Sequence, residues 1–188
     1  MNESNPFTAK KILVVLTGGI ACYKTATLVS RLVQSGAGVT VLMTEAATRF
    51  IAPLTFESLS GRAVITSPWE QVEHLDSQHV ALARAADLMI VAPATANTIA
   101  HFAAGTCDNA VTTAAMALPR DTPVLLAPAM NAQMWENPIT QHNLKTVKEL
   151  LGYHTVGPET GWQACRTEGT GRMSEAEAIL EAAAKLLR

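Results

Sequence analysis

Four short apolar runs divide the chain at fairly regular intervals. They cover residues 11–16, 39–43, 87–92 and 122–127, and a glycine, a proline or a small polar residue closes each one. Runs of this length that are rich in β-branched residues and end at such breakers are typical of buried strands. Between them, helices are expected over 20–35, 53–60, 79–86, 110–118 and 137–151, with a further one opening at 94–98.

This alternation of strands and helices predicts an α/β protein. Strand–helix–strand units build parallel sheets that carry helices on both faces. We therefore expect a three-layer, Rossmann-like or flavodoxin-like sheet in a single domain that spans residues 1–188. Two short strands are expected in addition, at 63–65 and 153–156, and a polar loop at 70–78.

Residues 157–173 interrupt the alternation. The segment is rich in glycine and contains Trp162 and Cys165. A long irregular segment is uncommon in a compact domain unless it is functional, so we expect a flap that closes over a site. After it, Ser174 to Glu177 have the spacing of a capping box, which predicts a final helix that extends to Leu187.

Composition and charge narrow the classes of function. With 188 residues, 48% of them hydrophobic and 16% charged, the chain either covers part of its surface with other subunits or has a large alanine-rich core. A net charge of −2 without a basic cluster argues against nucleic acid as a partner. No apolar run approaches the ~20 residues that span a bilayer.

The N-terminus and the cysteines carry two further expectations. Residues 1–6 lack the basic and then apolar pattern of a signal peptide, which favours a cytoplasmic location. The three cysteines show no CxxC spacing and no matching histidine spacing. A disulfide framework and a structural zinc site are therefore not expected, and no metal is predicted.

Polar residues and glycines follow the ends of the predicted strands. The carboxyl ends of parallel strands meet at one edge, where open sheets bind their ligands. A Gly-Gly turn there lets backbone N–H groups approach a phosphate or a ring, and Thr44 either caps the next helix or binds phosphate. Together these residues predict a small-molecule site for a phosphorylated cofactor. The groups at this edge are Gly18, Gly19, Thr44, Thr95, Asn97 and Asn131.

The turn after the fourth strand offers two interpretations. The amide of Asn131 can donate and accept in one plane, so it suits a carboxylate or an amide, while Met130, Met134 and Trp135 would form an adaptable apolar wall. Alternatively, the turn only joins a strand to a helix, with Asn131 as the cap and the other side chains in the core.

Two further side chains are candidates for chemistry. His79 lies in the first turn of a predicted helix, where the helix dipole favours the neutral imidazole that a general base requires. The alternative is a surface or capping histidine. Cys165 lies in the glycine-rich flap, whereas an unreactive free cysteine is usually a small buried hydrophobe.

Several motifs resemble those of the flavin-dependent cysteine decarboxylases. The strongest is 128–135, which has the form PxMNxxMW, and further matches lie at 17–24, 43–50, 92–98 and 107–109. His79 falls where that family places its active-site histidine. The resemblance implies FMN as the cofactor. It assigns cofactor contacts to Gly18, Gly19, Ile20, Thr44, Phe50, Thr95, Ala96, Asn97 and Thr98.

Cys165 and the ending Gly169-Thr170-Gly171-Arg172-Met173 resemble the branch that acts on phosphopantothenoylcysteine. That branch implies FMN-dependent decarboxylation to 4′-phosphopantetheine in coenzyme A biosynthesis, through a thioaldehyde and an enethiol. His79 would be the base, Cys165 the proton donor and Asn131 the group that holds the substrate. The other substrate contacts implied are Met134, Ala164, Arg172 and Met173.

The resemblance also leaves alternatives and implies an assembly. One alternative is a peptidyl-cysteine decarboxylase of the lantibiotic type, and another is an FMN-binding regulatory subunit without turnover. Relatives assemble as trimers or as dodecamers of trimers, so a homo-oligomer is expected here. Bacterial relatives are often fused to the synthetase that makes their substrate, so the chain is either a free-standing enzyme or a fragment of such a fusion.

Overall fold

A computed structural model describes residues 5–69 and 78–187, apart from the side chains of residues 78–80. Its main sheet has five parallel strands in the order β2-β1-β3-β4-β5. This strand order is that of the flavodoxin-like fold, so the predicted fold class is confirmed. The strands are β1 (Lys11–Leu16), β2 (Gly38–Met43), β3 (Leu88–Ala94), β4 (Val124–Pro128) and β5 (His154–Thr155).

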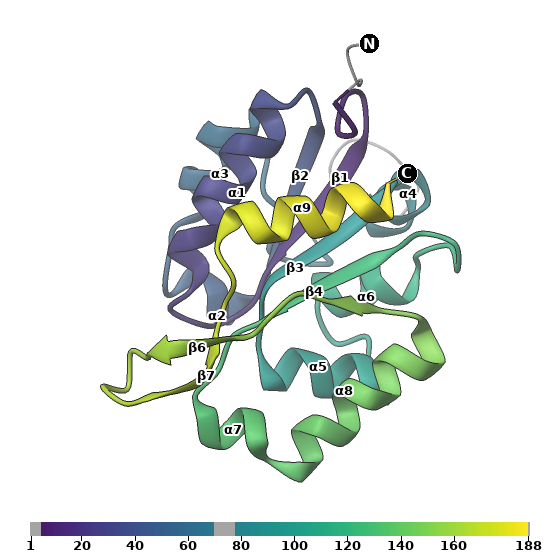
Figure 1. The fold of residues 1–188 in the computed structure, drawn as a ribbon. Coiled ribbons are helices and arrows are strands. Elements are labelled where there is room, and N and C mark those ends of the chain that lie inside the picture. The colour runs from purple at the N-terminus through teal and green to yellow at the C-terminus, as the bar shows by residue number, and fades with distance from the viewer. Residues whose placement is uncertain (1–4, 70–77, 188) are drawn as a thin grey trace.

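Helices cover both faces of this sheet (Figure 1). The longer ones are α1 (Cys22–Gln34), α3 (Pro53–Ser60), α4 (Gln78–Ala85), α5 (Ala96–Ala104), α6 (Ala110–Met116), α8 (Pro138–Leu151) and α9 (Ala176–Leu186). Two short helices, α2 (Glu45–Thr48) and α7 (Ala132–Glu136), follow β2 and β4.

Side chains of the central strands alternate between two hydrophobic clusters. Ile12 and Val14 of β1 point toward α1, α3 and α9, whereas Leu13 and Val15 point toward α5, α6 and α8. All four are at most 3% exposed. Successive residues of a strand face opposite sides of the sheet, so the continuous apolar runs in the sequence reflect strands that are buried on both faces. The sheet is therefore a rigid base for the turns at its carboxyl edge.

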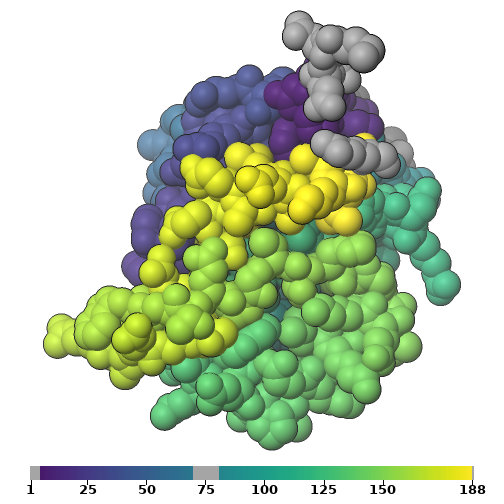
Figure 2. Space-filling model, in the orientation of Figure 1, coloured from purple at the N-terminus to yellow at the C-terminus, as the bar shows by residue number. Residues whose placement is uncertain are grey.

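The flap is more regular than the sequence suggested, so that expectation was wrong in detail. Residues 157–173 contain an antiparallel hairpin of β6 (Glu159–Trp162) and β7 (Glu168–Arg172), paired from Glu159 with Arg172 to Trp162 with Glu168. The hydroxyls of Thr160 and Thr170 are 2.9 Å apart across it. Glycine and polar residues weaken strand propensity, but cross-strand hydrogen bonds form the ladder here. Figure 2 shows the hairpin projecting from the body of the molecule.

Other expectations also need correction. Residues 63–65 form no strand and contribute only an isolated bridge between Leu42 and Ile65. The capping box is absent, because the N-cap of α9 is Glu175, whose side chain makes no capping hydrogen bond, and Ser174 is buried. The expected loop at 70–78 lies outside the described residues, apart from Gln78, which begins α4.

Within the described residues, no group of histidine, cysteine and acidic side chains is arranged to hold a metal ion. None of the helices described here is both long and apolar enough to cross a membrane.

Candidate functional site

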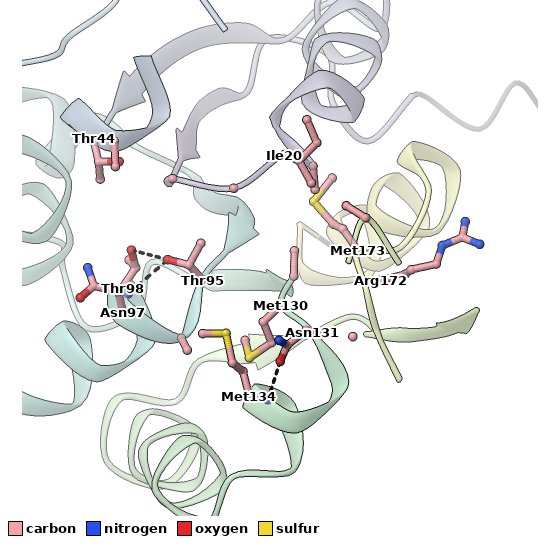
Figure 3. Close-up of a pocket in the computed structure, with 18 of the residues that line it drawn as sticks. Ile20, Thr44, Thr95, Asn97, Thr98, Met130, Asn131, Met134, Arg172 and Met173 are labelled. Carbon is pink, nitrogen blue, oxygen red and sulfur yellow. Dashed lines mark hydrogen bonds between the residues drawn. The ribbon is translucent and has the colours of Figure 1, made fainter. Parts of the chain in front are cut away.

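A cavity of about 1040 Å³ opens at the carboxyl edge of the sheet. The turns after β1, β2, β3 and β4 form one side, and the hairpin β6–β7 forms the other (Figure 3). It lies where the strand order reverses between β1 and β3, the point at which open α/β sheets bind ligands. The predicted site residues that line it are Gly18, Gly19, Ile20, Thr44, Thr95, Ala96, Asn97, Thr98, Asn131, Met134, Ala164, Cys165, Arg172 and Met173.

Hydrogen bonds join the turns after β1 and β3. The buried Thr17 hydroxyl lies 2.6 Å from the Pro93 carbonyl oxygen and 3.1 Å from the Thr95 hydroxyl. Thr95 in turn caps α5 by accepting from the N–H of Thr98 at 3.4 Å. Two loops that lie 78 residues apart in the sequence therefore form one surface of the cavity.

This surface suits a flat, phosphorylated cofactor. A Cβ added at Gly18 would lie 2.5 Å from the Cβ of Ala46, so only glycine lets the first turn approach α2 this closely. The Thr44 hydroxyl accepts from the Ala47 N–H at 3.2 Å, which leaves its own hydrogen available to donate. Capping and anion binding by Thr44 are thus compatible, and the uncovered backbone near Gly19 can approach a ring.

Asn131 both caps a helix and lines the cavity, the two roles that the sequence offered as alternatives. Its Oδ1 accepts from the Met134 N–H at 2.8 Å and caps α7, while the residue also lines the cavity. Because capping uses only the amide oxygen, the Nδ2 hydrogens can donate to a ligand carboxylate or carbonyl. Met130 and Met134 line the cavity as expected, whereas Trp135 does not and packs against the hydrophobic cluster below.

The hairpin is docked against the Asn131 turn by backbone and amide contacts. Met130 N–H donates to the Gly171 carbonyl at 3.0 Å, and Ala132 N–H donates to Oε1 of Gln163 at 3.1 Å. Gln163 is 6% exposed, and its Nε2 also donates to the Gly169 carbonyl at 3.3 Å. Gln163 was not predicted from the sequence. The signal that could have identified it is a polar residue between Trp162 and Cys165, in a segment expected to close over a site.

Cys165 lies in the tip connection between β6 and β7. Its sulfur is 2.9 Å from the Thr167 hydroxyl oxygen and 3.5 Å from Oε1 of Gln163. The side chain is exposed and lines the cavity. Cys22 is different, because it is buried, donates to the Thr17 carbonyl at 3.2 Å, and its pKa is raised by burial. The thiol beside the cavity is therefore Cys165.

Two predicted residues are not brought to the cavity by the described structure. Phe50 is 50% exposed and does not line it, so a role in cofactor binding stays a prediction. The backbone of His79 lies in α4, but its side chain lies outside the described part of the chain. Conversely, the cavity includes His101, whose Nδ1 is 3.4 Å from Oδ1 of Asp108, and Lys24. Neither was a candidate from the sequence.

Replacing Gly171 by alanine is expected to detach the hairpin from the Asn131 turn. A Cβ at this position, where φ is +154°, would clash with the Met130 carbonyl oxygen. We expect a stability loss of about 1–3 kcal/mol and faster tryptic cleavage after Arg166, an exposed hairpin residue. Gly61→Ala is the control, since φ is +67° there and nothing lies within 4 Å. Equal cleavage of both variants would contradict the docking role.

Comparisons with known proteins agree with this geometry. The curated Streptococcus mutans protein described as a probable phosphopantothenoylcysteine decarboxylase is 44% identical over 172 residues, which cover 92% of this chain and 96% of that protein. The coenzyme A biosynthesis bifunctional protein CoaBC of Vibrio cholerae is 49% identical over 166 residues, covering 88% of this chain and 41% of that protein. The chain thus spans nearly all of the first relative and less than half of the second.

Solved structures give the same picture. A PPC decarboxylase mutant complexed with pantothenoylaminoethenethiol matches with a TM-score of 0.83 and 28% identity, over 93% of this chain and 96% of that one. The FMN-binding protein AtHal3 matches with a TM-score of 0.80 and 29% identity, over 93% of this chain and 94% of that one. The family model named Flavoprotein matches residues 1–188. The chain therefore belongs to the Flavoprotein family.

Proposed function

We propose that this chain is a phosphopantothenoylcysteine decarboxylase that works with bound FMN and forms 4′-phosphopantetheine for coenzyme A biosynthesis. The observation that carries the proposal is that Asn131 and Cys165 line one cavity together with the turns after β1 and β3. The name of the Streptococcus mutans relative and the substrate-like compound in the PPC decarboxylase complex support this substrate, and the AtHal3 structure supports FMN.

Residues of three turns would hold the cofactor. Gly18 and Gly19 bring uncovered backbone to the cavity, Thr44 offers a hydroxyl hydrogen, and Thr95 and Asn97 lie at the N-terminal end of α5. Bound FMN would supply the two-electron oxidation of the substrate thiol and the return of those electrons. The roles of the remaining residues follow from the substrate's own chemistry.

Once the substrate sulfur is part of a thioaldehyde, its carboxylate lies β to the C=S group. The C–CO₂ bond can then break because the C=S group accepts the electron pair, which gives an enethiolate. Asn131 Nδ2 would hold the carboxylate or the neighbouring amide, and Met134, Ala164 and Met173 would cover the substrate. Closure of the hairpin over the bound substrate would exclude water from this step and strengthen the polar contacts inside.

Cys165 would give the proton that saturates the enethiolate carbon. The Thr167 hydroxyl, 2.9 Å from the sulfur, orients the thiol and connects it to solvent at the exposed hairpin tip. His79 is proposed as the base that takes the proton of the substrate thiol, on the strength of its place at the start of α4 and of the family resemblance.

The proposal includes a cytoplasmic homo-oligomer, either a trimer or a dodecamer built from trimers. Several large apolar side chains are exposed near the cavity and along α3, which supports coverage by further copies. They include Ile20 at 55%, Tyr23 at 62%, Phe50 at 50% and Leu54 at 68% exposure. In such an assembly Phe50 would be available to the cofactor of a neighbouring copy.

The direct test is anaerobic turnover. The purified protein with bound flavin is mixed with phosphopantothenoylcysteine, and CO₂ and product mass are followed. Loss of CO₂ with the saturated thiol as product is the expected result. Release of CO₂ only from a peptide with a C-terminal cysteine, giving an enethiol, would assign a peptidyl-cysteine decarboxylase instead. No CO₂ from either substrate would leave a flavin-binding protein without this activity and would contradict the role of Cys165.

A further inference from the structure

A second, smaller cavity of about 290 Å³ lies beside the main one. The two share Tyr23, Lys24 and Arg172, so the smaller cavity is a side chamber at the end of the larger. Figure 3 shows the Arg172 side chain pointing away from the labelled cofactor-side residues Thr44, Thr95 and Asn97. Arg172 therefore faces this chamber rather than the centre of the main cavity.

Two cations in the side chamber converge on a single oxygen atom. Nζ of Lys24 is 2.6 Å from Oε1 of Glu175, and Nη2 of Arg172 is 3.2 Å from the same oxygen. Lys24 also donates to the Met173 carbonyl at 3.1 Å, which fixes the position of its ammonium group. The Lys24 side chain is only 12% exposed, so its charge interacts strongly with a nearby anion. The position of Oε1 is thus a well-defined anion position.

Glu175 reaches that position from the protein surface, although both cations hold it there. Its side chain is 52% exposed and makes no capping hydrogen bond to α9, although it is the N-cap residue. The other acidic residue of the chamber, Glu177, pairs with Arg31 at 2.7 Å. Two cations therefore face one exposed carboxylate, and the chamber keeps an excess of positive charge. A phosphate monoester, with a charge of about −1.5 to −2 near pH 7 and three acceptor oxygens, would match it better.

We propose that Lys24 and Arg172 bind the terminal phosphate of the substrate, and that Glu175 occupies this position until the phosphate displaces it. This inference rests on the proposed function and identifies the residues that distinguish the 4′-phosphorylated substrate from its unphosphorylated form. The arrangement suits a long molecule. Gly171 touches the Asn131 turn and Arg172 follows directly, while Met173 and Ile20 provide apolar surface beside them.

This proposal can be tested without turnover, by comparing the binding of the phosphorylated product with that of its unphosphorylated form. Calorimetry on the flavin-loaded protein compares 4′-phosphopantetheine with pantetheine. The wild type is expected to bind the phosphorylated ligand about 10- to 100-fold more tightly, as charge-assisted hydrogen bonds do. Lys24→Met should remove most of that difference and leave pantetheine binding unchanged. Lys10→Met is the matched control, because Lys10 forms a surface pair with Asp87 at 3.6 Å and lines neither cavity.

Glu175→Gln gives the more decisive result, because the direction of the change in ligand affinity depends on the role of Glu175. If Glu175 competes with the phosphate, the substitution should tighten 4′-phosphopantetheine binding several-fold and leave pantetheine unaffected. If Glu175 only fastens the hairpin to α1, both ligands should bind more weakly. Arg172→Gln gives a second measurement if Lys24→Met does not fold, and it too should weaken only the phosphorylated ligand.

The failures of the two proposals are distinguishable. Equal wild-type affinity for both ligands would overturn the phosphate site even in a protein that releases CO₂. Weaker binding of both ligands by Glu175→Gln would overturn it as well. Phosphate-dependent binding that Lys24→Met abolishes, in a protein that releases no CO₂, would support the side chamber and contradict the decarboxylase proposal.

Discussion

Cys165→Ser is expected to separate CO₂ release from formation of the saturated thiol. A serine hydroxyl is a far weaker acid than a thiol, so protonation of the enethiolate carbon should slow by at least about 100-fold, in line with the loss of a general acid. Carbon–carbon cleavage does not use this proton and should still occur, but without oxygen only one CO₂ is expected per bound flavin, because the two electrons taken from the thiol are not returned. The measurement is product mass under anaerobic conditions, where the enethiol should replace phosphopantetheine.

The Cys165→Ser substitution should leave the structure of the hairpin unchanged. Serine can keep the hydrogen bond that Cys165 makes to Thr167 at 2.9 Å, so the turn geometry should survive. Cys107→Ser is the matched control, because Cys107 is also free and exposed but does not line the cavity. Normal phosphopantetheine formation by Cys165→Ser would remove the proton-donor assignment.

Asn131→Asp is expected to weaken substrate use strongly while the fold stays intact. Aspartate caps a helix about as well as asparagine, so the contact to the Met134 N–H and α7 should remain. The substitution removes the donating Nδ2 group and places a negative charge where the substrate carboxylate would lie. We expect kcat/KM to fall by about 30- to 5000-fold, since losing a partner of a desolvated charge costs about 2–5 kcal/mol.

Asn137→Asp controls for the substitution itself. Asn137 is also a helix N-cap, accepting from the Ile139 N–H at 2.9 Å, and it does not line the cavity. Both variants should have a Tm close to that of the wild type and keep their flavin absorbance. Activity near the wild-type value in Asn131→Asp would show that the amide does not contact the substrate carboxylate.

The hydrophobic pattern predicted the sheet because burial on both faces leaves a continuous apolar run. Residues 11–16 and 39–43 were therefore located almost to the residue, as β1 and β2. The carboxyl-edge residues were predicted for the same reason, since strand direction alone brings the turn at Gly18 to the turn at Thr95. Thr44 shows the limit of this reasoning, because one hydroxyl can cap a helix and still donate to a ligand.

The structural details that the sequence did not predict depend on interactions between residues that are distant in the sequence. The hairpin was expected to be irregular because its strands contain glycines, yet Gly169 and Gly171 are what allow it to lie against α7 and Met130. The sequence left Trp135 either on the cavity wall or in the core, and only its packing in the fold shows that it lies against the core. Ser174 fitted a capping-box spacing, although the chain turns into α9 one residue later. Local spacing carries no information about any of these contacts.

The hairpin pairs with none of the five strands of the main sheet. Its two strands bond to each other, and the segment joins the body through the Gly171 and Gln163 contacts and the buried Met173. The residues of 160–168 other than Gln163 and Cys165 can consequently diverge between relatives without disturbing the packing of the core. A protein built this way can acquire a new substrate through changes in this hairpin, while the residues in the turns after the main strands keep their chemistry.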